Sequence, residues 1–171
     1  MTTQTYRTFD SLHVMSYIIK RCQFLNVPDL NTTKLQKLMY CCYGTVLTKF
    51  GFPISSEQPE AWQYGPVFPK TLRMLQKIPF EEFARLIDSS DVDLGLEDEH
   101  KKMIDTTLQF FGRYKASWLS AWSHSVGSPW ARASNDGEDL YGQIDDLTIV
   151  SYFKQHIFKP SAKLSELASS T

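Results

Sequence analysis

The sequence predicts a mainly α-helical fold, a single compact helical domain of about six to eight helices with at most a small β element. Apolar residues recur at three- and four-residue spacing through most of the chain, which is typical of helices that bury one face. Strand-like patterns are confined to residues 54–57 and 60–64, with a weaker one at 143–144. The chain has 171 residues, of which 42% are hydrophobic, enough for one substantial core. We therefore assign residues 1–160 to one domain and the small, polar residues 161–171 to a flexible C-terminal tail.

The clearest helix follows Asn31 and Thr32, which are both good N-cap residues, and stops at Gly51. Its apolar face carries Leu35, Leu38, Met39, Cys42, Val46, Leu47 and Phe50. The other face carries Lys34, Lys37, Cys41, Thr45 and Lys49. Lysines in such a pattern usually form a solvated helix face, so we expect these lysines to lie in water.

Two shorter helices are expected on either side of this one. Asp10 or Ser11 can cap the first, whose apolar stripe ends before Pro28. Pro69 can begin the next helix, because its missing N–H group costs nothing in a first turn. An apolar piece at 80–87 then runs into an acidic segment at 88–95 that is rich in turn formers. We expect this segment to be an exposed loop.

Helical spacing returns after the loop. Residues 103–111 form an apolar stripe that finishes near Gly112, and Ser117 can cap the following helix. A turn is expected at 135–137, which reads Asn-Asp-Gly. The last helix should begin near Asp145 or Asp146. The side chains that we expect it to turn inward are Leu147, Val150, Phe153 and Ile157.

Composition limits the classes of function. Eighteen basic and nineteen acidic residues give a net charge of −1, so no overall field attracts nucleic acid or an anionic membrane. No base-reading basic helix stands out, which makes nucleic-acid binding an unlikely function. No stretch approaches the roughly 20 apolar residues that span a bilayer. Three cysteines at these spacings suit neither a disulfide framework nor a zinc site. We expect a cytoplasmic protein with reduced thiols, without metal, cofactor or membrane contact.

One residue invites an enzymatic interpretation. His124 lies between Ser123 and Ser125, but no nucleophile elbow or Gly-rich oxyanion loop accompanies it. Glu60 stands close to Trp62 in the sequence, and a carboxylate in an aromatic cleft is a common general acid. A small hydrolase or transferase that uses His124 and Glu60 therefore stays as a rival. We favour a non-enzymatic role, in which His124 holds a turn by hydrogen-bonding backbone groups.

Two segments combine large aromatic residues with chain-bending Gly and Pro, which suggests packed turns. The first, 60–69, reads Glu-Ala-Trp-Gln-Tyr-Gly-Pro-Val-Phe-Pro, and the second, 119–130, reads Leu-Ser-Ala-Trp-Ser-His-Ser-Val-Gly-Ser-Pro-Trp. Large aromatic side chains bury much surface and seek one another's edges. We therefore predict that residues 62–66 pack against residues 123–130, and that Trp130 lies in the core.

These segments carry a resemblance to a known family. Together with Thr-Lys-Leu-Gln-Lys-Leu-Met-Tyr at 33–40, they resemble the Panacea domain of SocA-like antitoxins and phage-associated proteins. The later pattern of that family is Leu-Ser, Thr-His and Pro-Trp, and Ser123 here replaces its threonine. The resemblance extends over roughly residues 11–158. The motif positions, to which we assign structural roles, are Lys34, Leu35, Gln36, Lys37, Leu38, Tyr40, Ala61, Trp62, Tyr64, Gly65, Pro66, Val67, His124, Pro129 and Trp130.

The resemblance implies an antitoxin of a toxin–antitoxin system, which neutralises a cognate protein toxin by binding it directly. It also leaves open a proteolytic adaptor that delivers the toxin to a protease, and a phage or prophage protein that acts against host defence. A hydrolase and a DNA-binding repressor are weaker alternatives. The high content of Trp and Tyr suits a protein that acts through contact, because these residues dominate protein–protein hot spots.

Overall fold

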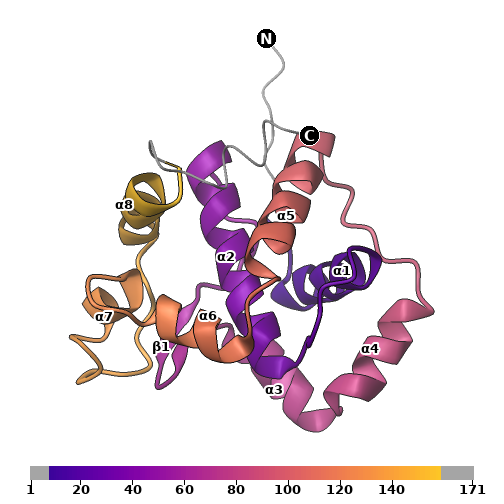
Figure 1. Ribbon diagram of the computed structural model, residues 1–171, viewed down its shortest axis with the longest axis horizontal. Coiled ribbons are helices and arrows are strands. Elements are labelled where there is room, and N and C mark those ends of the chain that lie inside the picture. The colour runs from indigo at the N-terminus through magenta and orange to yellow at the C-terminus, as the bar shows by residue number, and fades with distance from the viewer. Residues whose placement is uncertain (1–7, 159–171) are drawn as a thin grey trace.

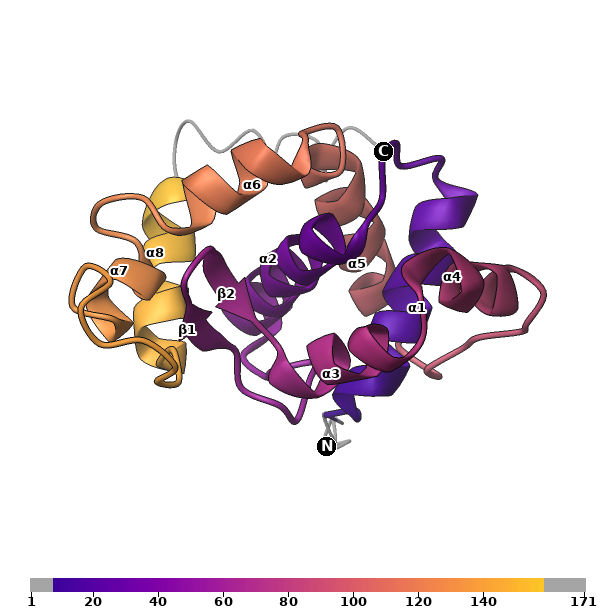
Figure 2. The same cartoon turned by 90° about the horizontal axis from the view of Figure 1, so that it is seen from below.

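Helix α2 (Thr32–Phe50) runs through the middle of the molecule, and the other helices are arranged around it (Figures 1 and 2). This computed structural model describes residues 8–158. The tail that we expected at 161–171 lies outside the described residues. Within the described range the fold is mainly α-helical with a single two-stranded sheet, which confirms the fold class.

The remaining helices follow the chain around α2. They are α1 (Ser11–Phe24), α3 (Pro69–Lys77), α4 (Phe80–Asp88), α5 (Asp98–Phe111), α6 (Ala116–Ser123), α7 (Pro129–Ala133) and α8 (Asp146–His156). Strands β1 (Glu60–Trp62) and β2 (Gly65–Val67) pair antiparallel, with Glu60 opposite Val67 and Trp62 opposite Gly65. The sequence pattern at 60–64 indicated the first strand, whereas the second had been expected to be part of a turn. Residues 54–57 form no strand, although Ser55 makes an isolated bridge with Phe9.

Local capping chemistry sets most helix boundaries. The side chains of Asp10, Asn31 and Asp145 each accept a hydrogen bond from a backbone N–H in the first turn of α1, α2 and α8. Gly51 ends α2 with a φ of +79°, the left-handed conformation that glycine adopts without strain. The prediction that Ser117 caps α6 was wrong, because Lys115 occupies the N-cap position and the helix already begins at Ala116.

Helix α2 has no broad solvent face, which corrects the expectation that its lysines lie in water. Helices α3, α5, α6 and α8 and strand β2 all pack against it. Every residue from Lys34 to Leu47 is buried, including Lys37, Cys41 and Thr45. Only Lys49, in the last turn, is exposed as expected. A helix that is enclosed on all sides must bury its polar residues too, so each of them needs a partner inside the protein.

The inward face of α8 agrees with the prediction at Phe153 and Ile157, which are buried, and at Val150, which packs partly buried against the core, but not at Leu147. Leu147 is 79% exposed, whereas Ile149 and Phe153 are fully buried. Gly44 of α2 makes this packing possible, since its missing side chain leaves the space that the Phe153 ring occupies. The close approach to Gly44 turns Phe153 inward, and Ile149, four positions before it on the same helix face, is buried in place of Leu147.

The expected loops are present. Residues 89–97 carry no helix or strand and are largely exposed, and residues 135–137 all have positive φ angles in a tight turn. No helix within residues 8–158 is long and apolar enough to cross a bilayer.

Candidate functional site

The two buried lysines of α2 each hold a backbone carbonyl from a distant part of the chain. The Lys34 ammonium donates to the carbonyl of Pro28 and to that of Gly112, both at 2.6 Å. The first carbonyl lies in the segment before α2, and the second lies at the C-terminal end of α5. Lys34 therefore joins these two segments and supplies a hydrogen-bond donor to both carbonyls. Burial lowers the pKa of Lys34, an effect that the carboxylate of Asp29 opposes.

Lys37 lies one turn further along α2, beneath the β1–β2 hairpin. Its ammonium donates to the carbonyl of Pro66 at 2.9 Å. Lys37 is only 2% exposed, and this burial lowers the pKa of its amine from the usual 10.5 to about 8. The ion pairs between described residues do not include Lys37. The site therefore contains a buried cation that has no carboxylate beside it.

Gln36 fixes the junction between the hairpin and α3. Its amide oxygen accepts from the backbone N–H of Phe68 at 2.8 Å, and its amide nitrogen donates to Thr71 Oγ1 at 2.8 Å. The apolar motif residues Leu35, Leu38 and Tyr40 are buried in the core around α2. Through these hydrogen bonds Lys34, Gln36 and Lys37 connect α2 to the segments that pack around it.

The hairpin approaches α2 closely at Gly65. This residue has a φ of +115°, a conformation open to glycine and strained for other residues. A Cβ atom at this position would lie 2.5 Å from Ser123 Oγ and 2.9 Å from Lys37 Cε. Pro66 and Val67, which follow, are buried, as is Ala61 on the paired strand. Glycine at this position therefore allows the hairpin to lie directly on Lys37 of α2 and on Ser123 of α6.

The two aromatic segments pack against each other, which confirms the prediction for residues 62–66 and 123–130. The indole Nε1 of Trp130 donates to the carbonyl of Trp62 at 2.6 Å, and Ser120 Oγ donates to the carbonyl of Tyr64 at 2.5 Å. Trp130 is only 6% exposed and Pro129 before it is buried. Trp62 is half-buried instead, and its indole N–H donates to Glu60 Oε2 at 2.8 Å.

His124 does not hold its turn as we expected. Its Nδ1 atom is buried and has no hydrogen-bond partner within the described part of the chain, while its ring packs 5.4 Å from the Trp130 ring. The serines on either side of it make the hydrogen bonds to the backbone instead. Ser123 Oγ donates to the carbonyl of Ser120, and Ser125 Oγ donates to that of Trp122. Ring packing against Trp130 is the structural role that the geometry gives His124.

A cavity of about 280 Å³ opens beside these motif residues, and we call it the motif cavity. The side chains that line it come from α2, the hairpin, α3 and the segment before α8: Thr32, Thr33, Gln36, Lys37, Trp62, Gln63, Tyr64, Val67, Leu72 and Tyr141. The sequence did not indicate Thr32, Thr33, Leu72 or Tyr141 as site residues. Tyr141 joins the hairpin because its backbone N–H donates to the carbonyl of Ala61 at 2.7 Å, a contact that no local pattern reveals.

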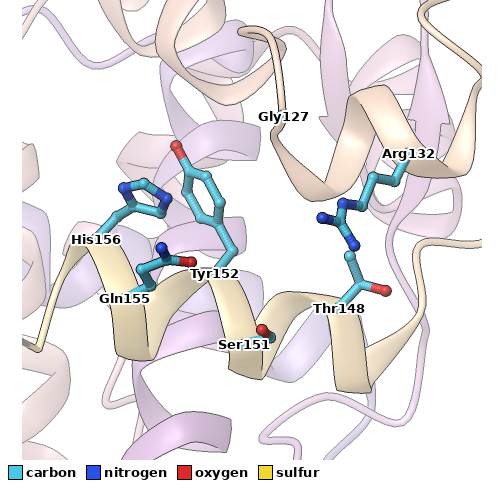
Figure 3. A pocket seen from close by; sticks show the side chains of 7 residues that line it. All are labelled: Gly127, Arg132, Thr148, Ser151, Tyr152, Gln155 and His156. Carbon is cyan, nitrogen blue, oxygen red and sulfur yellow. The ribbon is translucent and has the colours of Figure 1, made fainter.

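A second hollow of about 160 Å³ lies between α8 on one side and Gly127 and Arg132, before and within α7, on the other (Figure 3). Its lining is polar, and Arg132 and His156 stand at opposite ends of it (Figure 3). Both side chains are exposed, and the His156 ring packs 4.3 Å from that of Tyr152. An exposed polar groove without a buried charge gives little basis for specific binding, so the motif cavity is the stronger candidate.

The cysteines have the properties of core residues. Cys22, Cys41 and Cys42 are free thiols and fully buried. Burial raises the pKa of Cys22 to about 12 and also raises the pKa values of Cys41 and Cys42. Such thiols are poor nucleophiles and poor metal ligands. Within residues 8–158, no group of three or more His, Cys, Asp or Glu side chains could hold a metal ion.

Comparison with known proteins confirms the family resemblance. The family model described as "Antitoxin SocA-like, Panacea domain" matches residues 35–131. The chain belongs to this family. It is 30% identical over 142 residues to antitoxin SocA of Caulobacter vibrioides (strain NA1000 / CB15N), which covers 78% of this chain and 74% of that protein. No solved structure matches the chain.

The family match coincides with one part of the fold. Residues 35–131 run from the first turns of α2 to α7 and contain the hairpin, Lys37 and both aromatic segments. Helices α1 and α8 lie outside the match, although they complete the core around α2. The SocA-like Panacea domain of this chain therefore includes most of the lining of the motif cavity.

Proposed function

We propose that this protein is an antitoxin that neutralises a cognate protein toxin by binding it directly in a stoichiometric complex. Membership of the SocA-like family carries the proposal, because that family is described by its antitoxin activity. On this proposal the protein acts in the cytoplasm, turns over no small molecule and uses residues 1–160 as one antitoxin domain.

The surface around the motif cavity supports a protein partner. Tyr64 and Tyr141, which line the cavity, are 67% and 61% exposed, and elsewhere on the surface Trp118 of α6 is 42% exposed. Trp118 stacks on Tyr114 with ring centres 3.9 Å apart, which fixes its orientation. Rigid, exposed Tyr and Trp side chains lose little conformational entropy when they are buried, and they dominate the binding energy of many interfaces.

The test is co-expression with the product of a neighbouring small gene whose expression alone arrests growth. Rescue by this protein and co-elution of the two chains in a fixed ratio support the proposal. An interface that holds a toxin inactive should bury about 1,200 to 2,000 Å² in total. Protection at strongly sub-stoichiometric amounts of purified protein, with no protease present, would overturn direct neutralisation by binding. Protection that requires a protease would favour the adaptor role.

His124 provides a control for the enzymatic rival. We expect His124→Gln to neutralise the toxin as well as the natural protein does, because the ring of His124 packs against Trp130 and its buried Nδ1 atom has no hydrogen-bond partner among the described residues. Loss of neutralisation in a variant with unchanged melting temperature would give His124 a direct role and favour the hydrolase or transferase alternative.

A further inference from the structure

The motif cavity has the size of a side-chain pocket. Its volume of about 280 Å³ lies below the roughly 300 to 1,000 Å³ that is usual for small-molecule sites. Helix α2 and the hairpin form its walls, and both elements are held by the internal hydrogen bonds of Gln36 and Lys37. Such a cavity suits one side chain of a docked protein, since it is already formed before the partner arrives.

Lys37 gives the cavity an uncompensated positive charge. It is the one charged side chain among the described residues that line the cavity. Its ammonium has three N–H donors, and the hydrogen bond to Pro66 uses one of them. Glu60, the carboxylate on the hairpin, binds the Trp62 indole and does not line the cavity. A buried charge without a counter-charge is unfavourable, and an entering anion would relieve this cost.

Two further features favour an anionic occupant. Thr32 and Thr33, which also line the cavity, form the first turn of α2, where the helix dipole attracts negative charge. The mouth carries Tyr64 and Tyr141, and the Trp62 ring packs edge-on to Tyr141 at 5.3 Å. Aromatic side chains around a buried charge exclude water from it, the arrangement that surrounds interface hot spots.

We propose that the motif cavity receives the carboxylate side chain of an aspartate or glutamate of the toxin, with the Lys37 ammonium as its counter-charge. This inference rests on the proposed function, since it names the contact through which the toxin would be held. The aromatic mouth would pack against apolar atoms next to that carboxylate. Lys37 thus has two roles, because it supports the hairpin through Pro66 and keeps its remaining donors for the partner.

The first experiment measures the Kd of the toxin complex for matched variants. We expect Lys37→Met to raise the Kd at least 30-fold, the effect of removing one partner of a buried charge pair. Lys49→Met, in the exposed last turn of the same helix, should leave the Kd unchanged. Thr33 is exposed, so its variants should fold. Thr33→Glu places a competing carboxylate at the cavity and should bind at least tenfold more weakly than its uncharged analogue Thr33→Gln.

The outcomes separate the two proposals. If the natural protein forms no complex with any toxin, the proposed function fails. If it forms a complex and folded Lys37→Met and Thr33→Glu bind as tightly as Lys49→Met and Thr33→Gln, the proposed function stands and the carboxylate site is wrong.

A second experiment needs no toxin. Blocked glutamate, N-acetyl-glutamate methylamide, is titrated into the ¹⁵N-labelled protein and compared with blocked glutamine and with inorganic phosphate. We expect saturable shifts of the Trp62 indole and Gln63 backbone signals with blocked glutamate in the millimolar range, and their loss in Lys37→Met. Equal shifts with blocked glutamine, no saturation with blocked glutamate, or tighter binding of phosphate would each overturn the proposal.

Discussion

Lys37 should make the stability of this fold depend on pH in a characteristic direction. Burial lowers the pKa of its amine from the usual 10.5 to about 8, so the unfolded chain binds this proton more tightly than the folded protein. Lys37→Met removes the amine and keeps an unbranched side chain of similar length. The difference in unfolding free energy between the two proteins therefore isolates the contribution of this group.

The sign follows from proton binding in the two states. Below pH 8 both states carry the proton, and the fold bears the full cost of the buried charge, about 3 kcal/mol for this change in pKa. Between pH 8 and 10.5 the folded protein has released the proton while the unfolded chain retains it. Stability rises with pH wherever the unfolded state binds more protons, and the gain between pH 7 and pH 9 is about 1.3 kcal/mol.

The assay is urea denaturation of both proteins at pH 7, 8 and 9, followed by tryptophan fluorescence. Burial raises the pKa values of Tyr17 and Cys22 to about 12, which lowers stability at alkaline pH, but both residues are present in each protein and cancel in the difference. We expect Lys37→Met to be at least as stable as the natural protein at pH 7, because a buried charge is replaced by an apolar side chain. We then expect the natural protein to gain about 1.3 kcal/mol on it by pH 9.

Two results would refute this reasoning. Parallel stability curves for the two proteins between pH 7 and 9 would mean that the Lys37 pKa is not lowered by folding. A large loss of stability in Lys37→Met at pH 7 would mean that the hydrogen bond to Pro66 outweighs the cost of burying the charge.

Three further predictions concern the residues that hold the site, each measured by chemical denaturation. Lys34→Met should lower the unfolding free energy by about 2 kcal/mol, because it leaves two carbonyls without their donor, and an unchanged stability would contradict that role. Gly65→Ala should cost about 3 kcal/mol from backbone strain and steric overlap, whereas Gly51→Ala, which has a positive φ but open space, should cost about 1 kcal/mol. Equal costs would show that the close approach at Gly65 does not matter. Gly44→Ala should destabilise the protein by about 1 to 3 kcal/mol, because its methyl group would overlap the Phe153 ring. In the Gly44→Ala background, adding Phe153→Leu should restore at least about 1 kcal/mol of stability. If the costs of the two single substitutions simply added in the double variant, this contact would not be the cause.

The sequence by itself determined the features that depend on neighbouring residues. Asp10, Asn31 and Asp145 cap their helices through side chains that reach backbone groups two or three positions away, and Gly51 ends α2 through its own φ angle. These interactions are local, so residue type and spacing suffice to predict them. The pairing of the two aromatic segments was also predictable, because both combine apolar rings with residues that bend the chain.

Tertiary structure alone decided the environment of Lys34 and Lys37 and the composition of the motif cavity. Periodicity assigns a lysine to the polar side of a helix, but it does not show that other elements cover that side as well. The acceptor Gly112 lies 78 positions from Lys34 in the sequence, and Tyr141 reaches the hairpin only through the backbone of Ala61. Contacts over such distances depend on how all the helices pack around α2, and that packing places a buried cation at the site that we propose for the toxin.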